Sequence, residues 1–154
     1  MIYKLFKTDP LDLGSLIARI TVGIIILPHG LQKLLGLYGG YGFSATLDFF
    51  TTRGIPKIIG FLIISGESIG AFLLIIGLLG RISALGLILI MIGAIFMVHM
   101  QYGLFMNWFG NQAGQGYEYH LLVIGLSLIV LIKGAGKWSL DKLIFDIYKK
   151  WFKY

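Results

Sequence analysis

The sequence predicts an all-α membrane protein: a four-transmembrane-helix bundle with a C-terminal amphipathic surface helix. The 154 residues are 57% hydrophobic and only 13% charged, and their mean hydropathy is +0.86, whereas soluble domains carry about 25% charged residues. Four apolar stretches approach the length of about 20 residues that a membrane helix needs. Most lysines and arginines flank these stretches. We therefore expect the lipid bilayer to surround most of the chain.

The expected spans cover residues 13–37, 58–80, 82–103 and 117–133, within one transmembrane domain, residues 1–138. Lys4 and Lys7 before the first span resemble the start of a signal peptide, but no small-residue cleavage site follows, so we expect this span to be retained. Little more than Gly80-Arg81 joins the second and third spans, which predicts a tight helical hairpin. The fourth span is slightly short, so we expect local bilayer thinning or a snorkelling Lys133.

Two shorter helices are expected outside the spans. Ser44 is the predicted N-cap of a short amphipathic helix that stops at Gly54-Ile55-Pro56. Residues 139–154 are predicted to form an amphipathic helix on the cytoplasmic membrane surface, because their apolar side chains fall on one helical face and their lysines largely on others. A plain solvated tail is the alternative interpretation of this segment.

Basic residues also predict the orientation. With four spans both termini lie on one side, and most lysines and arginines outside the spans lie there, so the positive-inside rule places both termini in the cytoplasm. That side holds Lys4, Lys7, Arg81, Lys133, Lys137, Lys142, Lys149, Lys150 and Lys153, and the other holds Lys33, Arg53 and Lys57. We expect a multi-pass protein of the plasma (inner) membrane. Topology explains the net charge of +6, so no nucleic acid is expected as a partner.

Ionisable residues interrupt the spans at similar depth. They are His29 and Lys33 in the first span, Glu67 in the second, His99 in the third, and Glu118 and His120 at the start of the fourth. A charge inside a membrane helix is expensive and usually faces protein, water or ligand. At about 1.5 Å of rise per residue, all of these residues lie in the outer half of the bilayer. A bundle would let them converge in one polar pocket.

Structural roles are the alternative for each residue. Glu67 would need Lys33, a histidine or Arg19 as its partner, and such an ion pair would hold helices together. His29 and His99 would then be packed histidines bonded to backbone carbonyls. Arg19 is expected to snorkel or to form an ion pair. The polar network would in that case fix the register of the helices without binding a ligand.

The sequence assigns no cofactor. A metal, or a haem between His29 and His99, is the weaker interpretation, because no His-x-x-x-His or Glu-x-x-His spacing occurs within one helix. The chain has no cysteine, which excludes disulfides, Cys-ligated iron–sulfur clusters and Cys zinc sites within it. Tyr117 and Tyr119 belong either to an interfacial aromatic belt or to a wall on which a ligand stacks.

Several short motifs occur in a defined order. They are Gly23, Pro28-His29-Gly30-Leu31-Gln32-Lys33-Leu34, Glu67, Gly77-Leu78-Leu79-Gly80-Arg81, Ala94 before His99, Gly116-Tyr117-Glu118-Tyr119, and Gly134-Ala135-Gly136-Lys137-Trp138-Ser139-Leu140-Asp141. Together, over residues 16–141, they resemble the DoxX family. The resemblance implies a small bacterial or archaeal inner-membrane protein associated with quinone-linked oxidoreductase systems. It also implies that the family's polar motif positions are His29, Lys33, Glu67, His99 and Glu118. Ala135 replaces a common proline, and His120 departs from the usual pattern.

These observations together predict a DoxX-like membrane subunit of a quinone-linked oxidoreductase system. Glu67 and His29 would exchange protons with the oxygens of a quinone or similar small molecule. The expected ligand-binding residues are Lys33, His99, Glu118, Tyr117 and His120. A redox partner protein or soluble donor must supply electrons. The sequence leaves open whether the chain is an enzyme, whether it forms a homo-oligomer, and whether it is instead a non-enzymatic binding, transport or assembly subunit, including a proton-coupled transporter.

Overall fold

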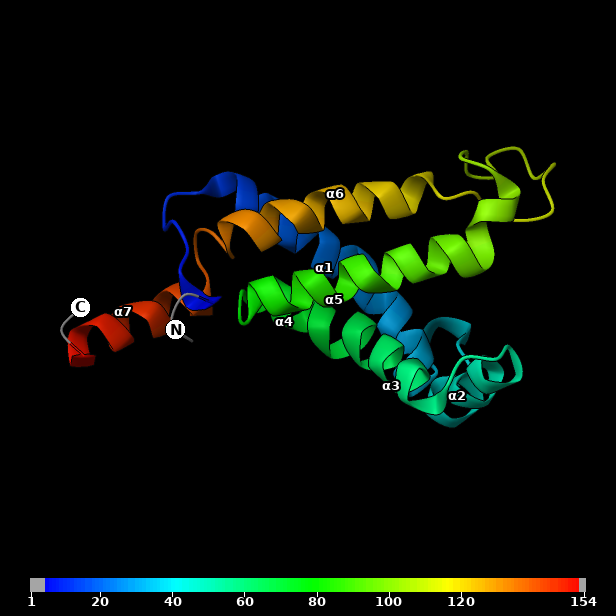
Figure 1. Cartoon of the computed structure of the whole chain (residues 1–154), viewed down its shortest axis with the longest axis horizontal. Helices are drawn as coiled ribbons and strands as arrows, with labels where there is room; N and C mark the ends of the chain where they lie inside the picture. The colour runs from blue at the N-terminus through cyan, green and yellow to red at the C-terminus, as the bar shows by residue number, and fades with distance from the viewer. Residues whose placement is uncertain (1–4, 153–154) are drawn as a thin grey trace.

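The computed structural model describes residues 5–152, and all regular structure within them is helical (Figure 1). The α-helices are α1 Leu13–Leu35, α2 Gly42–Thr52, α3 Lys57–Ser65, α4 Ala71–Ile76, α5 Gly80–Ala94, α6 Glu118–Lys133 and α7 Leu140–Phe152. Short turns of π-helix, η3 Gly66–Gly70 and η4 Ile95–His99, and of 3-10 helix, η2 Leu37–Gly39 and η5 Met100–Tyr102, connect or extend them.

Three helical stretches are long and apolar enough to cross a membrane: Leu13–Leu35, Lys57–Ile76 and Gly80–Tyr102. This confirms an all-helical membrane protein. The second stretch ends earlier than predicted because Gly77 and Leu79 adopt left-handed backbone angles, with φ of 68° and 52°. Helix α6 has 16 residues, fewer than the roughly 20 that a spanning helix needs. It packs along α5 and α1, and its predicted role as a fourth span stays a prediction.

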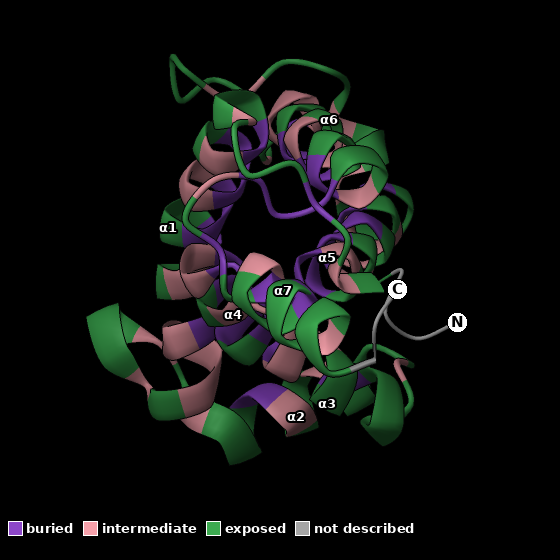
Figure 2. Ribbon diagram, turned by 90° about the vertical axis from the view of Figure 1, so that its left-hand side faces the viewer, coloured by how far each residue is buried: buried purple, intermediate pink, exposed green. Residues whose placement is uncertain are grey.

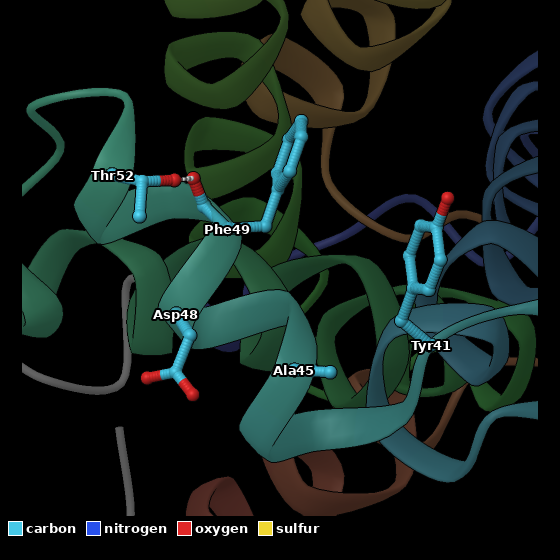
Figure 3. A pocket seen from close by; sticks show the side chains of 5 residues that line it. All are labelled: Tyr41, Ala45, Asp48, Phe49 and Thr52. Carbon is cyan, nitrogen blue, oxygen red and sulfur yellow. Dashed lines mark hydrogen bonds between the residues drawn. The ribbon is translucent and has the colours of Figure 1, made fainter.

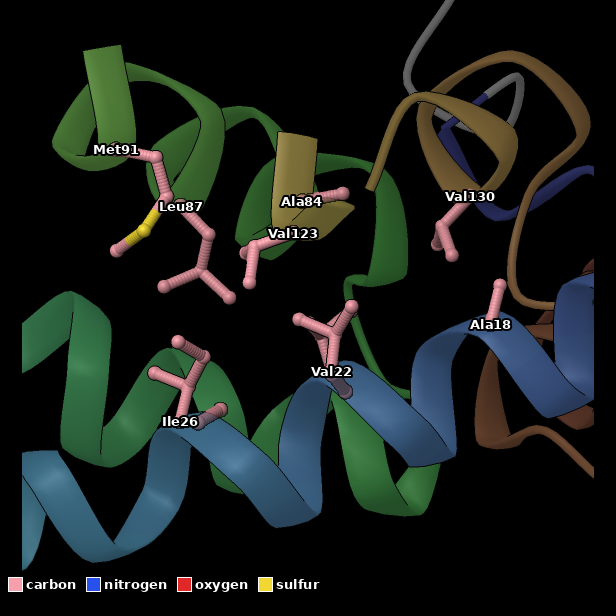
Figure 4. Close-up of a cluster of buried hydrophobic side chains, with 10 residues drawn as sticks. Ala18, Val22, Ile26, Ala84, Leu87, Met91, Val123 and Val130 are labelled. Carbon is pink, nitrogen blue, oxygen red and sulfur yellow. The ribbon is translucent and has the colours of Figure 1, made fainter. Parts of the chain in front are cut away.

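The core runs along the middle of the bundle. Ala18 and Val22 of α1 are each 1% exposed, and they face Val130 of α6 and Leu87 of α5 (Figure 4). Small residues allow α1 to approach the second span closely: a Cβ on Gly23 would lie 2.9 Å from the carbonyl oxygen of Ala71. Close backbone approach through small residues is a usual means of packing membrane helices. Buried residues face inward from all these helices, and exposed residues face outward (Figure 2).

The helices form two pairs that diverge. Helices α5 and α6 make one pair, and α1 with the α3–η3–α4 stretch makes the other. The pairs pack together near the start of α1 and the end of α6 and move apart toward the opposite end, where α2 follows one pair and the loop 103–117 joins the other (Figure 1). The polar residues of the predicted pocket lie toward this diverging end.

Arg19 lies toward the opposite end of the bundle and bonds several backbone segments together there. It is 1% exposed, and its guanidinium donates only to backbone carbonyl oxygens among the hydrogen bonds found for it. The acceptors are Ala135 (2.8 Å), Leu74 (3.0 Å), Ile75 (2.5 Å), Lys137 (3.0 Å) and Trp138 (2.7 Å). Arg19 is buried and therefore does not snorkel, and no ion pair is found for it among residues 5–152. Its acceptors come from the end of α4, where carbonyl groups lack helical partners, and from the stretch between α6 and α7.

Asp141 stabilises the hairpin between α4 and α5 through hydrogen bonds to its backbone. Its carboxylate accepts hydrogen bonds from the backbone N–H groups of Leu79 (2.7 Å) and Gly80 (2.9 Å), at the N-terminus of α5, where unpaired donors favour a negative charge. Burial raises the pKa of Asp141, and these hydrogen bonds and the Arg19 charge oppose that rise. The stretch from Gly134 to Asp141 therefore docks α7 onto the bundle.

Helix α7 continues beyond the end of the bundle that holds the termini (Figure 1). As expected, Ser139 caps it, since its Oγ accepts from the Lys142 backbone N–H (3.3 Å). Leu143, Ile147 and Trp151 are exposed. Its amphipathic surface role stays a prediction, and residues 153–154, like Lys4, lie outside the described residues.

Helix α2 begins earlier than the sequence predicted. It starts at Gly42, with Tyr41 at the N-cap position, so Ser44 lies inside the helix and is not its N-cap. The preceding chain folds tightly onto the end of α1: a Cβ on Gly40 would lie 2.2 Å from the Gln32 carbonyl oxygen.

Asp12 caps α1, and its removal is expected to have a pH-dependent cost. Its carboxylate accepts from the Ser15 N–H (3.1 Å) and pairs with Lys133 (3.0 Å); these contacts hold the pKa of Asp12 below its usual value of 3.8. A depressed pKa stabilises the fold above the unfolded-state pKa, and this stabilisation is lost as pH falls through the folded-state pKa. Asp12→Ala should lower stability by about 1 kcal/mol at neutral pH.

Thermal unfolding in detergent at several pH values checks this prediction. The gap between wild type and Asp12→Ala should shrink as pH falls below about 4. A gap that is unchanged at about pH 2 would contradict the assignment.

Candidate functional site

Glu67 and Lys33 form an ion pair between the second and first spans. Glu67 lies in the π turn η3, and its side chain is only 8% exposed, whereas Lys33 is 27% exposed. The backbones meet here too, because a Cβ on Gly30 would lie 2.2 Å from the Glu67 carbonyl oxygen. A buried carboxylate is stable when a cation pairs with it. The pair therefore places one charged group on each side of a tight α1–η3 contact.

Four aromatic rings continue from this ion pair across the diverging helices. His29 of α1 lies 6.4 Å from Tyr119 of α6, measured between ring centroids. Tyr119 contacts His120 edge-on at 5.4 Å, and His120 lies 4.1 Å from His99 of η4. His29 directly precedes Gly30, whose position meets the Glu67 backbone, so the row of rings begins next to the α1–η3 contact. The structure thus brings together residues from both helix pairs.

Two polar atoms in this row are buried without a hydrogen-bond partner among the described residues: the Tyr119 hydroxyl and His120 Nδ1. Buried polar groups in proteins are nearly always hydrogen-bonded, and each exception calls for an explanation. Here both atoms belong to neighbouring residues of α6, in the row of rings that begins at His29. Together they form an arrangement suited to a small molecule that carries hydrogen-bonding oxygens.

Sequence reasoning gave Tyr119 no role beyond an interfacial belt or a stacking wall. Its position next to His120, one residue along the same helix, gave no hint that its hydroxyl is buried. Only the contact between α6 and α1 places it between His29 and His120. The π turns that hold Glu67 and His99 had no sequence signal either, although such turns are frequent at functional sites.

Glu118 and Tyr117 face the loop 103–117. The Glu118 Oε1 accepts from the Met106 backbone N–H (3.1 Å) and from Trp108 Nε1 (2.9 Å). The Tyr117 backbone N–H donates to the Gly103 carbonyl oxygen (3.2 Å). These contacts fold the loop against the start of α6. Glu118 therefore holds the loop, whereas His120 and Tyr119 lie in the row of rings.

His99 connects the loop 103–117 to the row of four rings. Its Nδ1 donates to the Gln115 carbonyl oxygen at 2.9 Å, so in the neutral ring Nε2 is the acceptor. This contact orients the imidazole that stacks near His120. Within residues 5–152, no group of three or more His, Asp or Glu side chains could hold a metal ion.

A hollow of about 360 Å³ lies elsewhere, on the exposed side of α2. Its lining residues all come from one helical stretch: Tyr41, Ala45, Asp48, Phe49 and Thr52 (Figure 3). No second element faces them in this set, and the row of rings does not contribute to it. We therefore assign the candidate site to the Glu67–Lys33 pair and the four rings.

Comparisons with known proteins show the family to which the chain is similar. The model of the DoxX family matches residues 14–100. The chain is 31% identical over 134 residues to "Putative oxidoreductase CatD" of Bacillus subtilis. This match covers 87% of this chain and 89% of that protein. It is 30% identical over 131 residues to the membrane protein Rv3486 of Mycobacterium tuberculosis, covering 80% of this chain and 77% of that protein.

It is also 26% identical over 140 residues to the inner membrane protein YqjF of Escherichia coli, covering 91% of this chain and 96% of that protein. No solved structure matches the chain. The family match extends over more than half of the sequence, from the start of α1 to the end of the third apolar stretch. The chain therefore belongs to the DoxX family of membrane proteins.

Proposed function

We propose that this protein is the membrane subunit of a quinone-linked oxidoreductase system and binds the quinone ring between its two helix pairs. The observation that carries the proposal is the buried Tyr119 hydroxyl and His120 Nδ1, both without a hydrogen-bond partner among residues 5–152, in the row of rings that begins at His29. A quinone has two carbonyl oxygens and a flat ring, which match these donors and the surrounding aromatic rings. The name of the CatD relative, an oxidoreductase, favours the same class of activity.

The site residues suit the protons of this chemistry. Reduction of a quinone to a quinol consumes two electrons and two protons. Tyr119, His120 and His29 would donate hydrogen bonds to the ring oxygens, and Glu67 would pass protons to this row. The chain supplies no electrons itself, so a redox partner protein or soluble donor provides them. Whether the chain catalyses the transfer or only holds the ring follows from assays with that donor.

The proposal includes a membrane arrangement. Helix α6 is the fourth span, which its packing along α5 and α1 supports. Both termini then lie on the cytoplasmic side of the inner membrane, as the positive-inside rule predicts. Helix α7 follows at the cytoplasmic side, where its exposed lysines Lys149 and Lys150 would favour anionic lipid. The polar site consequently lies toward the outer side.

Tyr119→Phe tests the binding site with a minimal change. The variant removes one hydroxyl, and the loss of a single hydrogen bond of about 0.5–1.5 kcal/mol should weaken quinone binding roughly 2- to 12-fold. Binding is measured with purified protein as the quinone-dependent rise in unfolding temperature. Ser127→Ala is the matched control, because Ser127 on the same helix also buries a hydroxyl without a partner.

Two results would count against the proposal. Wild-type protein that gains no stability from quinone would exclude the binding site. Equal losses in Tyr119→Phe and Ser127→Ala would show that the hydroxyl contributes to packing alone, and would favour the alternative of a non-enzymatic subunit with a structural polar network.

A further inference from the structure

The loop 103–117 leaves the third apolar stretch and returns to α6. That stretch, Gly80–Tyr102, is long and apolar enough to cross a membrane, so the loop begins where the chain leaves the hydrocarbon layer. The Glu118 backbone N–H donates to the Leu104 carbonyl oxygen (2.8 Å), which closes the loop at its base. Figure 1 shows the loop on the opposite side of this end of the bundle from α2.

The polar side chains of the loop bond to the loop itself. Asn107 Nδ2 donates to the Gln112 carbonyl oxygen (3.0 Å), and Asn107 Oδ1 accepts from the Gln112 backbone N–H (3.1 Å). The Asn107 backbone N–H donates to Gln115 Oε1 (2.8 Å), and Glu118 accepts from Met106 and Trp108. These groups have partners without water, so a less polar surrounding would not leave them unsatisfied.

Charge is absent from this part of the chain. No Asp, Glu, Lys or Arg occurs from Ile82 to Tyr117, whereas Asp48 and Arg53 occur in and just after α2. Moving a charged group out of water is costly, and moving an apolar ring is not. The loop can therefore enter a layer of low polarity without that cost. Without Lys or Arg it also gains nothing from anionic headgroups.

Three aromatic rings of the loop are exposed. Phe105 is 66%, Trp108 78% and Phe109 90% exposed. Exposed apolar side chains on the spanning helices are expected, because lipid covers them, but these rings lie beyond the end of such a helix. Exposed apolar residues at its last turns, Phe96 and Met100, lead up to them. The lipid-facing surface of the third stretch thus continues into the loop.

We infer that the loop 103–117 inserts Phe105, Trp108 and Phe109 into the boundary between headgroups and acyl chains on its side of the bilayer. Tryptophan is enriched at this depth. The indole N–H of Trp108 already donates to Glu118 (2.9 Å), so the ring enters with its polar atom satisfied. Glu118 therefore holds the inserted rings in place. This interaction surface is independent of the proposed quinone.

The fluorescence of Trp108 tests the inserted position. The chain has three tryptophans, and Trp138→Phe with Trp151→Phe leaves Trp108 as the single reporter. The protein is reconstituted without quinone in phosphatidylcholine that carries bromine on the acyl chain, either next to the headgroup or at the chain end. Bromine next to the headgroup should lower the emission at least about twofold, and more than bromine at the chain end. Iodide on both sides of the vesicles should quench little.

Glu118→Ala in the same background tests the residue that holds the rings. It removes the acceptor shared by Met106 and Trp108, so quenching by bromine next to the headgroup should fall at least about twofold and quenching by iodide should rise. Gln101→Ala is the matched control, because Gln101 also precedes α6 and bonds a backbone group, but to Val98 in its own helical turn (3.1 Å). It should leave both kinds of quenching unchanged.

Three results would overturn the inference. Strong quenching by iodide without quenching by bromine would place the loop in water. Absence of quenching by both would mean that protein, such as a second copy of the chain, covers Trp108. Equal effects of Glu118→Ala and Gln101→Ala would remove Glu118 as the holder of the rings. The first two need only the reporter protein, so they decide the question even where Glu118→Ala does not fold.

Discussion

Arg19→Met is expected to destabilise the protein by about 4–5 kcal/mol, the largest effect of any single substitution considered for it. Arg19 is 1% exposed and donates to carbonyl oxygens of the α4 end and of the stretch before α7. Methionine fills a similar volume but donates no hydrogen bond, so these buried carbonyl groups would lose their partner. Undocking of α7 and of the α4–α5 hairpin should accompany the loss of stability.

Thermal unfolding in detergent, combined with hydrogen exchange of residues 134–152, measures both effects. Arg19→Lys should restore little of the stability that Arg19→Met loses, because an ammonium group cannot donate to several carbonyl oxygens in the planar arrangement that suits a guanidinium. Arg81→Met is the control, since Arg81 also donates to carbonyl oxygens, those of Leu131, Ile132 (2.8 Å) and Lys7 (3.3 Å), of which the first contact is part-buried and the other two are exposed. Its cost should be near 1 kcal/mol. Equal costs for Arg19→Met and Arg81→Met would contradict the assigned role.

Lys33→Met should destabilise the protein more than Glu67→Gln does, although the two residues form one ion pair. The side chain of Glu67 is 8% exposed, and that of Lys33 is 27% exposed. Removing Lys33 leaves a carboxylate in a buried position without its cation, which should cost about 3 kcal/mol. Removing the charge of Glu67 leaves a lysine whose side chain is already 27% exposed and can extend outward, at a cost of about 1 kcal/mol.

A double-mutant cycle checks this asymmetry. The Lys33→Met, Glu67→Gln double variant should be more stable than Lys33→Met alone, with a coupling free energy above about 1 kcal/mol. The pair Lys142–Asp146 on α7 is a suitable reference, because Asp146 is 52% exposed and surface pairs contribute about 0.5 kcal/mol or less. Additive effects at Lys33 and Glu67 would show that the two side chains do not interact in the membrane.

The candidate site shows which features local sequence patterns predict and which they do not. Apolar length and the position of each ionisable residue along a helix predicted that Glu67 would need a partner and named Lys33 among three choices. Selecting Lys33 required the contact of Gly30 with the Glu67 backbone, which no single helix specifies. Glu118 illustrates the same limit, since its carboxylate turns to Met106 and Trp108 of the loop, a choice made by loop folding.

The sequence by itself determined the class of the protein and the approximate positions of its three long apolar helices, because hydropathy and helical period depend only on neighbouring residues. Only the tertiary structure decided that the helix pairs diverge, that Tyr119 lies between His29 and His120, and that Arg19 bonds to carbonyl groups more than 100 residues away along the chain, such as that of Ala135. Such features arise from packing between distant segments, where a small change in helix angle or register alters which side chains meet.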